Sequence, residues 1–270
     1  MAYVLLPALV VVAGLVATAI VSVVLRNQVQ DVEQGHLQSA TERAAERIEA
    51  RFDLYSEQLF GLRPLFEGDP HRTTRAEFQV WLQAAGVFER LPGIQALSFV
   101  RVVASADRDT FEAAVRQDNS ANGIGYPEFE VNPDSEASRL FVVDFIEPME
   151  GNKAAFGFNI GTSPDALIAV ETARDTGDPV ATAPITLVQE TEDQKGMVLL
   201  LGVYDTPSVP TTEEVRRSSL SGLISAVFRI DDMLAGALGA DPRVILEIYD
   251  VGPSDAEPLQ PHESGLLSDS

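Results

Sequence analysis

The N-terminal segment most constrains what this chain can be, because residues 2–25 carry no charged side chain. A helix of this length reaches about 36 Å, which exceeds the hydrocarbon core of a bilayer, about 30 Å. The sequence therefore predicts a transmembrane anchor at residues 1–26. A cleavable signal peptide is the alternative, because Ala17-Thr18-Ala19 resembles a small-residue cleavage site. The length of the apolar run and the lack of a basic region before it favour a retained anchor.

Residues 27–67 continue with a polar helical pattern. Apolar side chains recur at helical spacing through this segment, among them Val32, Ile48, Phe52 and Leu59. They form one apolar stripe on a long helix. A helix that leaves the membrane directly is a stalk, and we expect it to pack on the following domain, on a second copy in a homodimer, or on both. The alternative is an ordinary amphipathic helix on a globular domain.

Composition excludes several classes of protein. The formal net charge is −22 and there is no cysteine. Such an acidic surface repels nucleic acid and anionic lipid headgroups, so we expect no nucleic-acid partner and no peripheral membrane binding. The lack of cysteine excludes a disulfide scaffold, a thiolate nucleophile and a cysteine-ligated zinc site.

The rest of the chain reads as strands mixed with short helices. Helices are expected after the capping residues Thr74 and Ser163, and another begins at Asp107. Short helices are also expected at 215–220 and 231–238. The expected strands cover residues 94–103, 126–131, 140–146, 156–160, 180–188, 197–204, 223–230 and 244–249. Because strands and helices do not alternate strictly, this order predicts an α+β fold with a mostly antiparallel sheet, which can hold a small ligand against a helix.

The sequence contains no recognisable catalytic motif. His36, His71 and His262 lack metal-ligand spacing, so no metal site is predicted. Motifs for a nucleophilic serine, a phosphate loop or a dinucleotide are also missing, so neither a catalytic residue nor a cofactor is predicted. Asp144 and Glu147 form the one candidate acid/base pair, and we expect them to be structural or binding groups. An exported hydrolase that uses this pair is the alternative function.

An ordered series of segments from residue 92 onward resembles the CHASE domain (cyclase/histidine-kinase-associated sensory extracellular). The matching segments are PGIQALSFVRVV at 92–103, FVVDFIEP at 141–148, GNKAAFGFNI at 151–160, ATAPITLVQE at 181–190, KGMVLLLGVY at 195–204 and GLISAVFRIDDML at 222–234. Each segment is weak alone, but their common order is specific.

The resemblance implies a long N-terminal helix followed by two PAS-like α/β units. The membrane-distal unit would occupy residues 68–205 and the membrane-proximal unit residues 206–252. We expect residues 27–270 to be periplasmic in a bacterial inner-membrane receptor that controls a histidine kinase, a diguanylate cyclase or a phosphodiesterase. The polar tail at 253–270 would precede a second transmembrane helix of a longer product, or else the chain is a stand-alone sensor.

The resemblance also implies a site for a small-molecule ligand in the distal unit. Asn159 stands where the family often has an Asp that can hydrogen-bond the ligand, and an amide both donates and accepts. Ala181 stands where cytokinin receptors place an apolar pocket residue, and Gly202 stands where many members have Pro. These departures predict a ligand other than cytokinin. The residues expected to form the site are Asn159, Ala181, Thr182, Leu187, Tyr204, Phe141 and Phe145.

Alternatives remain for these positions. Asn159 could instead satisfy backbone groups at a strand end, and the phenylalanines could belong to the core rather than to the pocket wall. A domain that binds no ligand and serves as a dimerisation scaffold is a further alternative. A filled cavity beside Asn159 would favour the scaffold.

Overall fold

A computed structural model describes residues 39, 41–91, 93–187 and 195–238. The predicted anchor at 2–25, the strand at 244–249 and the tail at 253–270 lie outside the described residues. Within the described part, no helix combines the length and the apolar character that crossing a bilayer requires. Met1–Glu49 and Ala50–Ser270 form separate units. The architecture below is that of the second unit.

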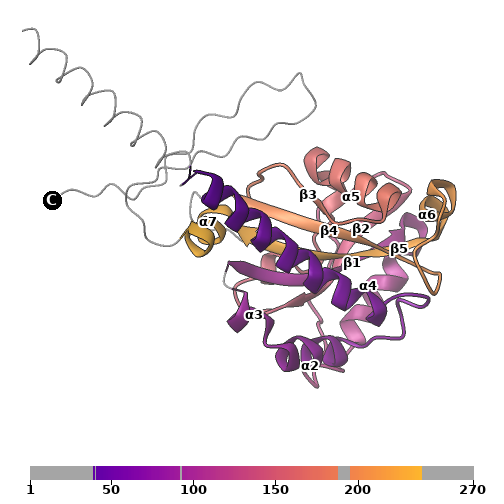
Figure 1. The fold of residues 1–270 in the computed structure, drawn as a ribbon. Helices are drawn as coiled ribbons and strands as arrows, with labels where there is room; N and C mark the ends of the chain where they lie inside the picture. The colour runs from indigo at the N-terminus through magenta and orange to yellow at the C-terminus, as the bar shows by residue number, and fades with distance from the viewer. Residues whose placement is uncertain (1–38, 40, 92, 188–194, 239–270) are drawn as a thin grey trace, which may run out of the picture. The chain divides into compact units, whose positions relative to one another are not determined.

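Within the described residues, five strands form one antiparallel sheet (Figure 1). Their order across the sheet is β2-β1-β5-β4-β3. The strands are β1 (Ile94–Ala104), β2 (Arg139–Glu147), β3 (Val180–Ala181), β4 (Gly196–Tyr204) and β5 (Leu220–Arg229). The last of the described strands, β5, therefore occupies the centre of the sheet.

Strand β5 corrects the predicted division at residue 206. It pairs with β1 along one edge and with β4 along the other. A boundary at 206 would remove the central strand and leave two unpaired strand edges. The strands on both sides of that position therefore belong to one sheet and not to two separate units.

The helices begin and end close to their predicted positions. Residues 41–49 of the first unit and residues 50–62 of the second unit are helical, and a 3-10 turn, Arg63–Leu65, follows them. The other described helices are α2 (Arg75–Ala85), α3 (Val87–Arg90), α4 (Arg108–Gln117), α5 (Pro164–Thr176), α6 (Glu213–Ser219) and α7 (Ile230–Leu238). The predicted caps are confirmed, because Thr74 forms a capping box with Glu77 and the Ser163 side chain accepts from the amide of Ala166.

Three predicted strands differ from the structure. Residues 126–131 and 156–160 form no strand, and only single bridges join Asn132 to Phe158 and Val142 to Asn159. The apolar alternation of these segments instead packs side chains into a small cluster, in which the rings of Phe129 and Phe156 lie 4.7 Å apart. Of the strand predicted at 180–188, the described residues 180–187 form only β3 (Val180–Ala181) and a single bridge from Ile185 to Gly196.

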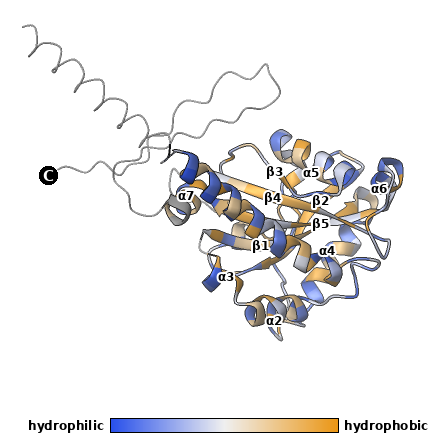
Figure 2. Cartoon of the chain, viewed as in Figure 1, coloured by the Kyte–Doolittle hydropathy of each residue, from blue (hydrophilic) through white to orange (hydrophobic). Residues whose placement is uncertain are grey.

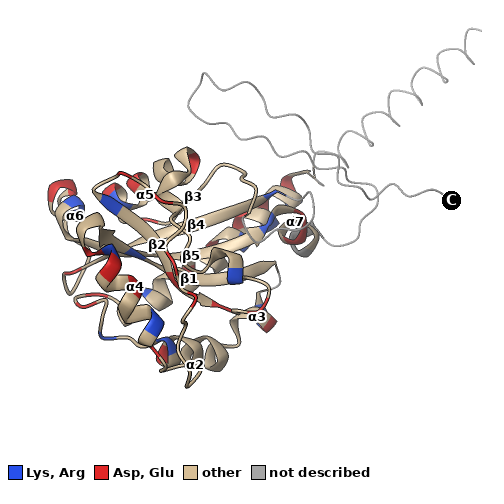
Figure 3. Ribbon diagram, turned by 180° about the vertical axis from the view of Figure 1, so that it is seen from behind, with Lys and Arg blue, Asp and Glu red and all other residues tan. Residues whose placement is uncertain are grey.

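The sheet is covered on both faces, which explains why its strands are apolar on both sides (Figure 2). On one face, the helix of residues 50–62 packs with α2 and α7 against side chains such as Phe99 and Phe228. On the other face, α5 packs through Ala169, Val170 and Ala173. Charged residues are concentrated on the helices and loops around the sheet, while β4 and β5 carry few of them (Figure 3).

One carboxylate is an exception to this apolar core. In the register of β1 with β2, Phe99 lies opposite Phe145 and Val100 lies opposite Val143, so Asp144 is an extra residue in β2. Such a bulge leaves a residue outside the ladder of hydrogen bonds. Asp144 is only 2% exposed. Its charge and its backbone carbonyl both need partners inside the protein.

Two arginines supply those partners. Arg75, at the first position of α2, donates to the backbone oxygen of Asp144 and to its carboxylate Oδ1. Arg101 from β1 donates to Oδ2 of the same carboxylate. The second carboxylate of the cluster is Asp118, whose Oδ2 accepts from Nε of Arg75 at 2.8 Å. The ring of Phe145 also faces the Arg75 guanidinium, 4.6 Å away.

We expect Arg75→Met to destabilise the protein by about 3–5 kcal/mol, because it leaves a buried carboxylate and a buried carbonyl without their main donor. Urea denaturation followed by circular dichroism measures this loss. Arg90→Met is the matched control, since Arg90 is exposed and its guanidinium donates to the carbonyl of Ala85 at 3.2 Å, a group at the protein surface. Equal stability of the two variants would contradict a structural role for the cluster.

Candidate functional site

The most promising site is a cavity between the sheet and the first turn of α5. Its volume is about 110 Å³. Strands β1, β2, β4 and β5 supply its floor, for example through Val100 and Leu200. Ala166 of α5 and the segments 155–160 and 182–187 supply its walls. The site is thus assembled from both halves of the described chain.

Hydroxyl groups provide the polar surface of the cavity. Ser98 and Ser225 lie opposite each other in the pairing of β1 with β5, and their hydroxyls are hydrogen-bonded to each other. Thr182 accepts from the amide of Val198 at 3.1 Å, and Ser163 caps α5. Thr186 accepts from Nζ of Lys195 at 3.1 Å in an exposed position.

No described residue that lines the cavity is charged. Besides the hydroxyls, the lining consists of aliphatic side chains and the ring of Phe158. A ligand bound here would therefore find hydrogen-bonding groups but no counter-charge. Within the described residues, no group of three or more His, Asp or Glu side chains is arranged to hold a metal ion.

Two of the seven predicted site residues line this cavity. They are Thr182 and Leu187, both of which are buried. Gly196 lets Leu187 lie there, because a Cβ atom at that glycine would fall 2.3 Å from Cγ of Leu187. Thr182, the residue that matches the family pattern, thus lies at the cavity, and its role in binding a ligand stays a prediction.

Asn159 and Ala181 do not line the cavity. The Asn159 side chain is buried, and its Oδ1 accepts from the amides of Phe141 at 3.1 Å and Gly161 at 3.3 Å. It therefore satisfies backbone groups at the edge of β2, which was the alternative interpretation of this residue. Ala181 lies in the two-residue edge strand β3 and is exposed.

The three predicted aromatic residues have packing roles. Phe141 packs in the cluster beneath α5, near Gly161. Phe145 belongs to the cluster on the opposite face of the sheet, where its ring meets those of Phe66, Phe78 and Phe99. Tyr204 is fully buried, and its hydroxyl donates to the carbonyl of Arg174 at 2.7 Å. Burial raises the pKa of this phenol above its usual value.

The acid/base pair of a hydrolase is not formed. Both carboxylate oxygens of Asp144 accept from arginines and the residue is buried, so this carboxylate is held in ion pairs away from solvent water. Burial raises the pKa of Glu147, and its carboxylate is hydrogen-bonded by Gln79. A raised pKa suits a general acid, but the partner carboxylate that the reaction requires is already occupied.

Ser98 and Ser225 escaped prediction. Each is one small polar residue in an apolar strand, IQALSFVRVV and LISAVFRI. A small polar residue within a buried apolar strand indicates a polar contact in the core, and it could have drawn attention to both positions. However, the pairing of the two residues became evident only when β5 was placed beside β1.

With this geometry established, comparison with known proteins identifies the family. The CHASE domain family matches residues 71–260, more than two thirds of the chain. The chain belongs to the CHASE domain family. CHASE domains are extracytoplasmic sensory domains of signalling receptors and are not themselves catalytic, which overturns the hydrolase alternative. No curated protein matches the chain.

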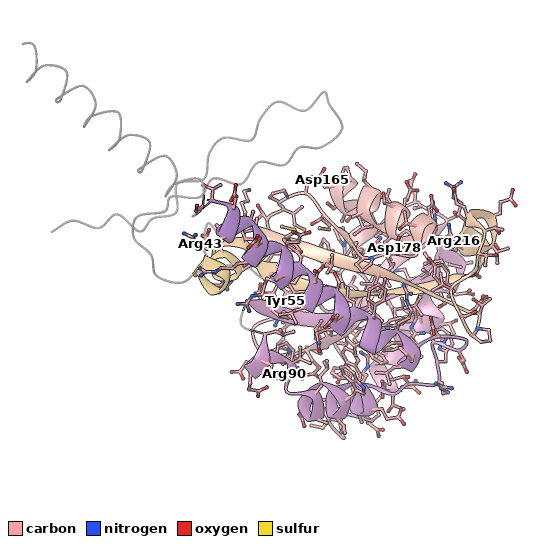
Figure 4. The ribbon with its side chains drawn as sticks, in the orientation of Figure 1. Arg43, Tyr55, Arg90, Asp165, Asp178 and Arg216 are labelled. Atoms are coloured by element: carbon pink, nitrogen blue, oxygen red, sulfur yellow. The ribbon has the colours of Figure 1, made fainter. Side chains whose placement is uncertain are left out.

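The far end of helix α5 in this CHASE domain is held by several donors. Arg63 donates to the carbonyl of Gly177 at 2.7 Å, and Arg216 donates to that of Asp175 at 2.6 Å. Figure 4 shows Arg216 at the same end of the unit as Asp178, which follows α5. The positive charge of these arginines complements the negative, C-terminal end of the helix dipole. Gly202 permits the approach of α5, since a Cβ there would lie 3.2 Å from the carbonyl oxygen of Ala173.

The carboxylate of Asp175 makes this end of α5 sensitive to pH. Hydrogen bonds from Arg217 and Arg174 hold its pKa well below the usual range. A carboxylate with a lowered folded-state pKa adds stability above its unfolded-state pKa, about 3.9, and loses that contribution as pH falls further. The side chain of Arg217 is 53% exposed, so solvent weakens the interaction.

We expect Asp175→Asn to lower the free energy of unfolding at pH 7 by about 1 kcal/mol. Below about pH 5, the variant should lose less stability than the unmodified protein as acid is added. Urea denaturation at a series of pH values measures both effects. Glu136→Gln, in the exposed loop before β2, serves as the charge control. A constant difference between Asp175→Asn and the unmodified protein down to pH 2 would contradict the assignment.

Proposed function

We propose that this CHASE domain senses a small molecule that binds in the cavity between the sheet and α5. The observation that supports this proposal best is the cavity itself, which lies inside a well-packed unit and is lined by Thr182, Leu187 and the pair Ser98–Ser225. Protein interiors seldom leave a void of this size, since each void forfeits packing energy. An open cavity next to the Asn159 segment also favours a ligand sensor over a ligand-free scaffold.

The signal would leave the cavity through helix α5. The N-cap Ser163 and Ala166 in the first turn of α5 line the cavity, while the C-cap Gly177 accepts a hydrogen bond from Arg63. Arg63 immediately follows the helix of residues 50–62. The amide of Gly68 also donates to the carbonyl of Tyr204 at 3.1 Å. A shift of α5 on ligand binding would therefore act directly on the end of the N-terminal helix.

The mechanism is a shift between two populations of the domain. A ligand that binds one arrangement of α5 more tightly raises the population of that arrangement. We infer that the chain is anchored by residues 1–26, dimerises through the stalk predicted at residues 27–67, and controls a histidine kinase or an enzyme of cyclic dinucleotide metabolism. The long amphipathic helical pattern and the family membership support this arrangement.

A library of neutral and charged metabolites tests the proposal. We expect at least one compound to raise the melting temperature of the full chain in nanodiscs, because a ligand that binds only the folded state stabilises it. Ala166→Leu should abolish that shift while leaving the protein folded, since the larger side chain fills the cavity.

Ile168→Ala, on the exposed side of the same helix, is the matched control and should keep the shift. A shift that persists in Ala166→Leu would place the ligand elsewhere. If no compound in a broad library produces a shift, the proposed function fails.

Arg63→Met tests the route of the signal. We expect a loss of stability of about 1.5–3 kcal/mol, the range for a hydrogen bond that involves a charged group. Ligand affinity should change by less than about threefold, because Arg63 does not line the cavity. In hydrogen exchange, ligand-dependent protection of residues 50–62 should disappear. Arg72→Met, at an exposed site, should retain that protection, and its retention in Arg63→Met would contradict the route.

A further inference from the structure

We propose that the ligand is an uncharged molecule about the size of one ring, with a hydrogen-bonding group that binds the hydroxyl pair of Ser98 and Ser225. This inference rests on the proposed function and specifies the chemistry of the same cavity. It differs from what the sequence predicted, because Asn159 does not line the cavity and its Oδ1 accepts from backbone amides, while Ala181 is exposed.

The hydroxyl pair has hydrogen-bonding capacity to spare. Ser98 and Ser225 are 1% and 2% exposed, and each lies on an interior strand of the sheet. Two hydroxyls together offer two hydrogens and four lone pairs. Their mutual bond uses one hydrogen and one lone pair. One hydrogen and three lone pairs remain, and both residues line the cavity.

The position of the pair indicates a use beyond folding. Backbone hydrogen bonds hold β1 and β5 together without any help from these side chains. An alanine at either position would avoid the cost of burying a hydroxyl whose hydrogen-bonding capacity is not fully used. A polar group of a ligand in the cavity would use that capacity. It would also be oriented, because the rest of the floor is aliphatic.

The lining also selects against charge. No described lining residue is ionised, so an anion or a cation would lose its hydration without gaining a counter-charge. Lys195 lies nearby, and its ammonium group donates to the hydroxyl of the lining residue Thr186 in an exposed position. An anion held by Lys195 would therefore lie at the rim, away from the serine pair.

The volume sets the size of the ligand. An apolar protein cavity of about 150 Å³ accepts benzene. The cavity here measures about 110 Å³. The cavity is smaller than that, so a single six-membered ring, or an aliphatic chain of similar volume, is the upper limit on what it encloses. With its polar group on the serine pair, such a ligand extends to the exposed rim at Thr186.

Four small probes of matched shape test this inference: phenol, toluene, benzamide and benzoate. Binding is measured by isothermal titration calorimetry on the full chain in nanodiscs, with empty nanodiscs as the blank. We expect phenol to bind about tenfold more tightly than toluene, which lacks the hydroxyl. We expect benzamide to bind at least about 100-fold more tightly than benzoate, which carries a charge.

Substitutions then locate the polar group. Ser98→Ala/Ser225→Ala should remove the preference for phenol over toluene and keep toluene binding. Ser221→Ala is the matched control, because Ser221 also lies on β5 but donates to the carbonyl of Val203 and does not line the cavity. It should leave all four affinities unchanged. Thermal denaturation of each variant confirms that it is folded.

The outcomes separate the ligand class from the proposed function. If probes bind and Ala166→Leu abolishes their binding, but toluene equals phenol or the serine variant keeps the preference, the inference is wrong and the sensor function stands. Tight binding of benzoate that is lost in Lys195→Met would likewise overturn it in favour of an anion at the rim. If neither the four probes nor any library compound binds, both proposals fail.

Discussion

The carboxylate of Asp144, buried between two arginines, is the interaction on which much of this unit depends. It sits in a bulge of β2, where its backbone carbonyl also lacks a strand partner. Arg75 satisfies both groups and so ties the start of α2 to the sheet, while Arg101 neutralises the charge from β1. This carboxylate, which the sequence analysis expected to be a structural or binding group, therefore links β1, β2 and α2.

These contacts of Asp144 with Arg75 and Arg101 stabilise the face of the sheet opposite the cavity. There α2, α7 and the helix of residues 50–62 bury a continuous apolar cluster. The other face is covered by α5 and irregular segments, and it leaves a cavity. This division is physically reasonable for a sensor. A rigid, fully packed face can support a second face that changes its packing when a ligand binds.

Helix α5 connects the two regions. Its first turn borders the cavity, and its last carbonyls accept from Arg63, Tyr204 and Arg216. Membership of the CHASE family makes the unit an extracytoplasmic sensory domain. The contacts of α5 offer a route from the cavity to the N-terminal helix. The hydroxyl pair in the cavity floor offers the chemistry by which the ligand would be selected.

The sequence by itself determined the local structure and the family. Helix ends at Thr74 and Ser163 depend on side chains within a few residues of each other, and the ordered segments from residue 92 onward identified CHASE. Only the tertiary structure decided what depends on distant residues. It inserted β5 between β1 and β4, and this joined Ser98 to Ser225. In the tertiary structure, Oδ1 of Asn159 accepts from backbone amides, and only Thr182 and Leu187 of the expected residues line the cavity. The sequence does not show this, because the side of a strand that faces a cavity depends on bulges and on strand order.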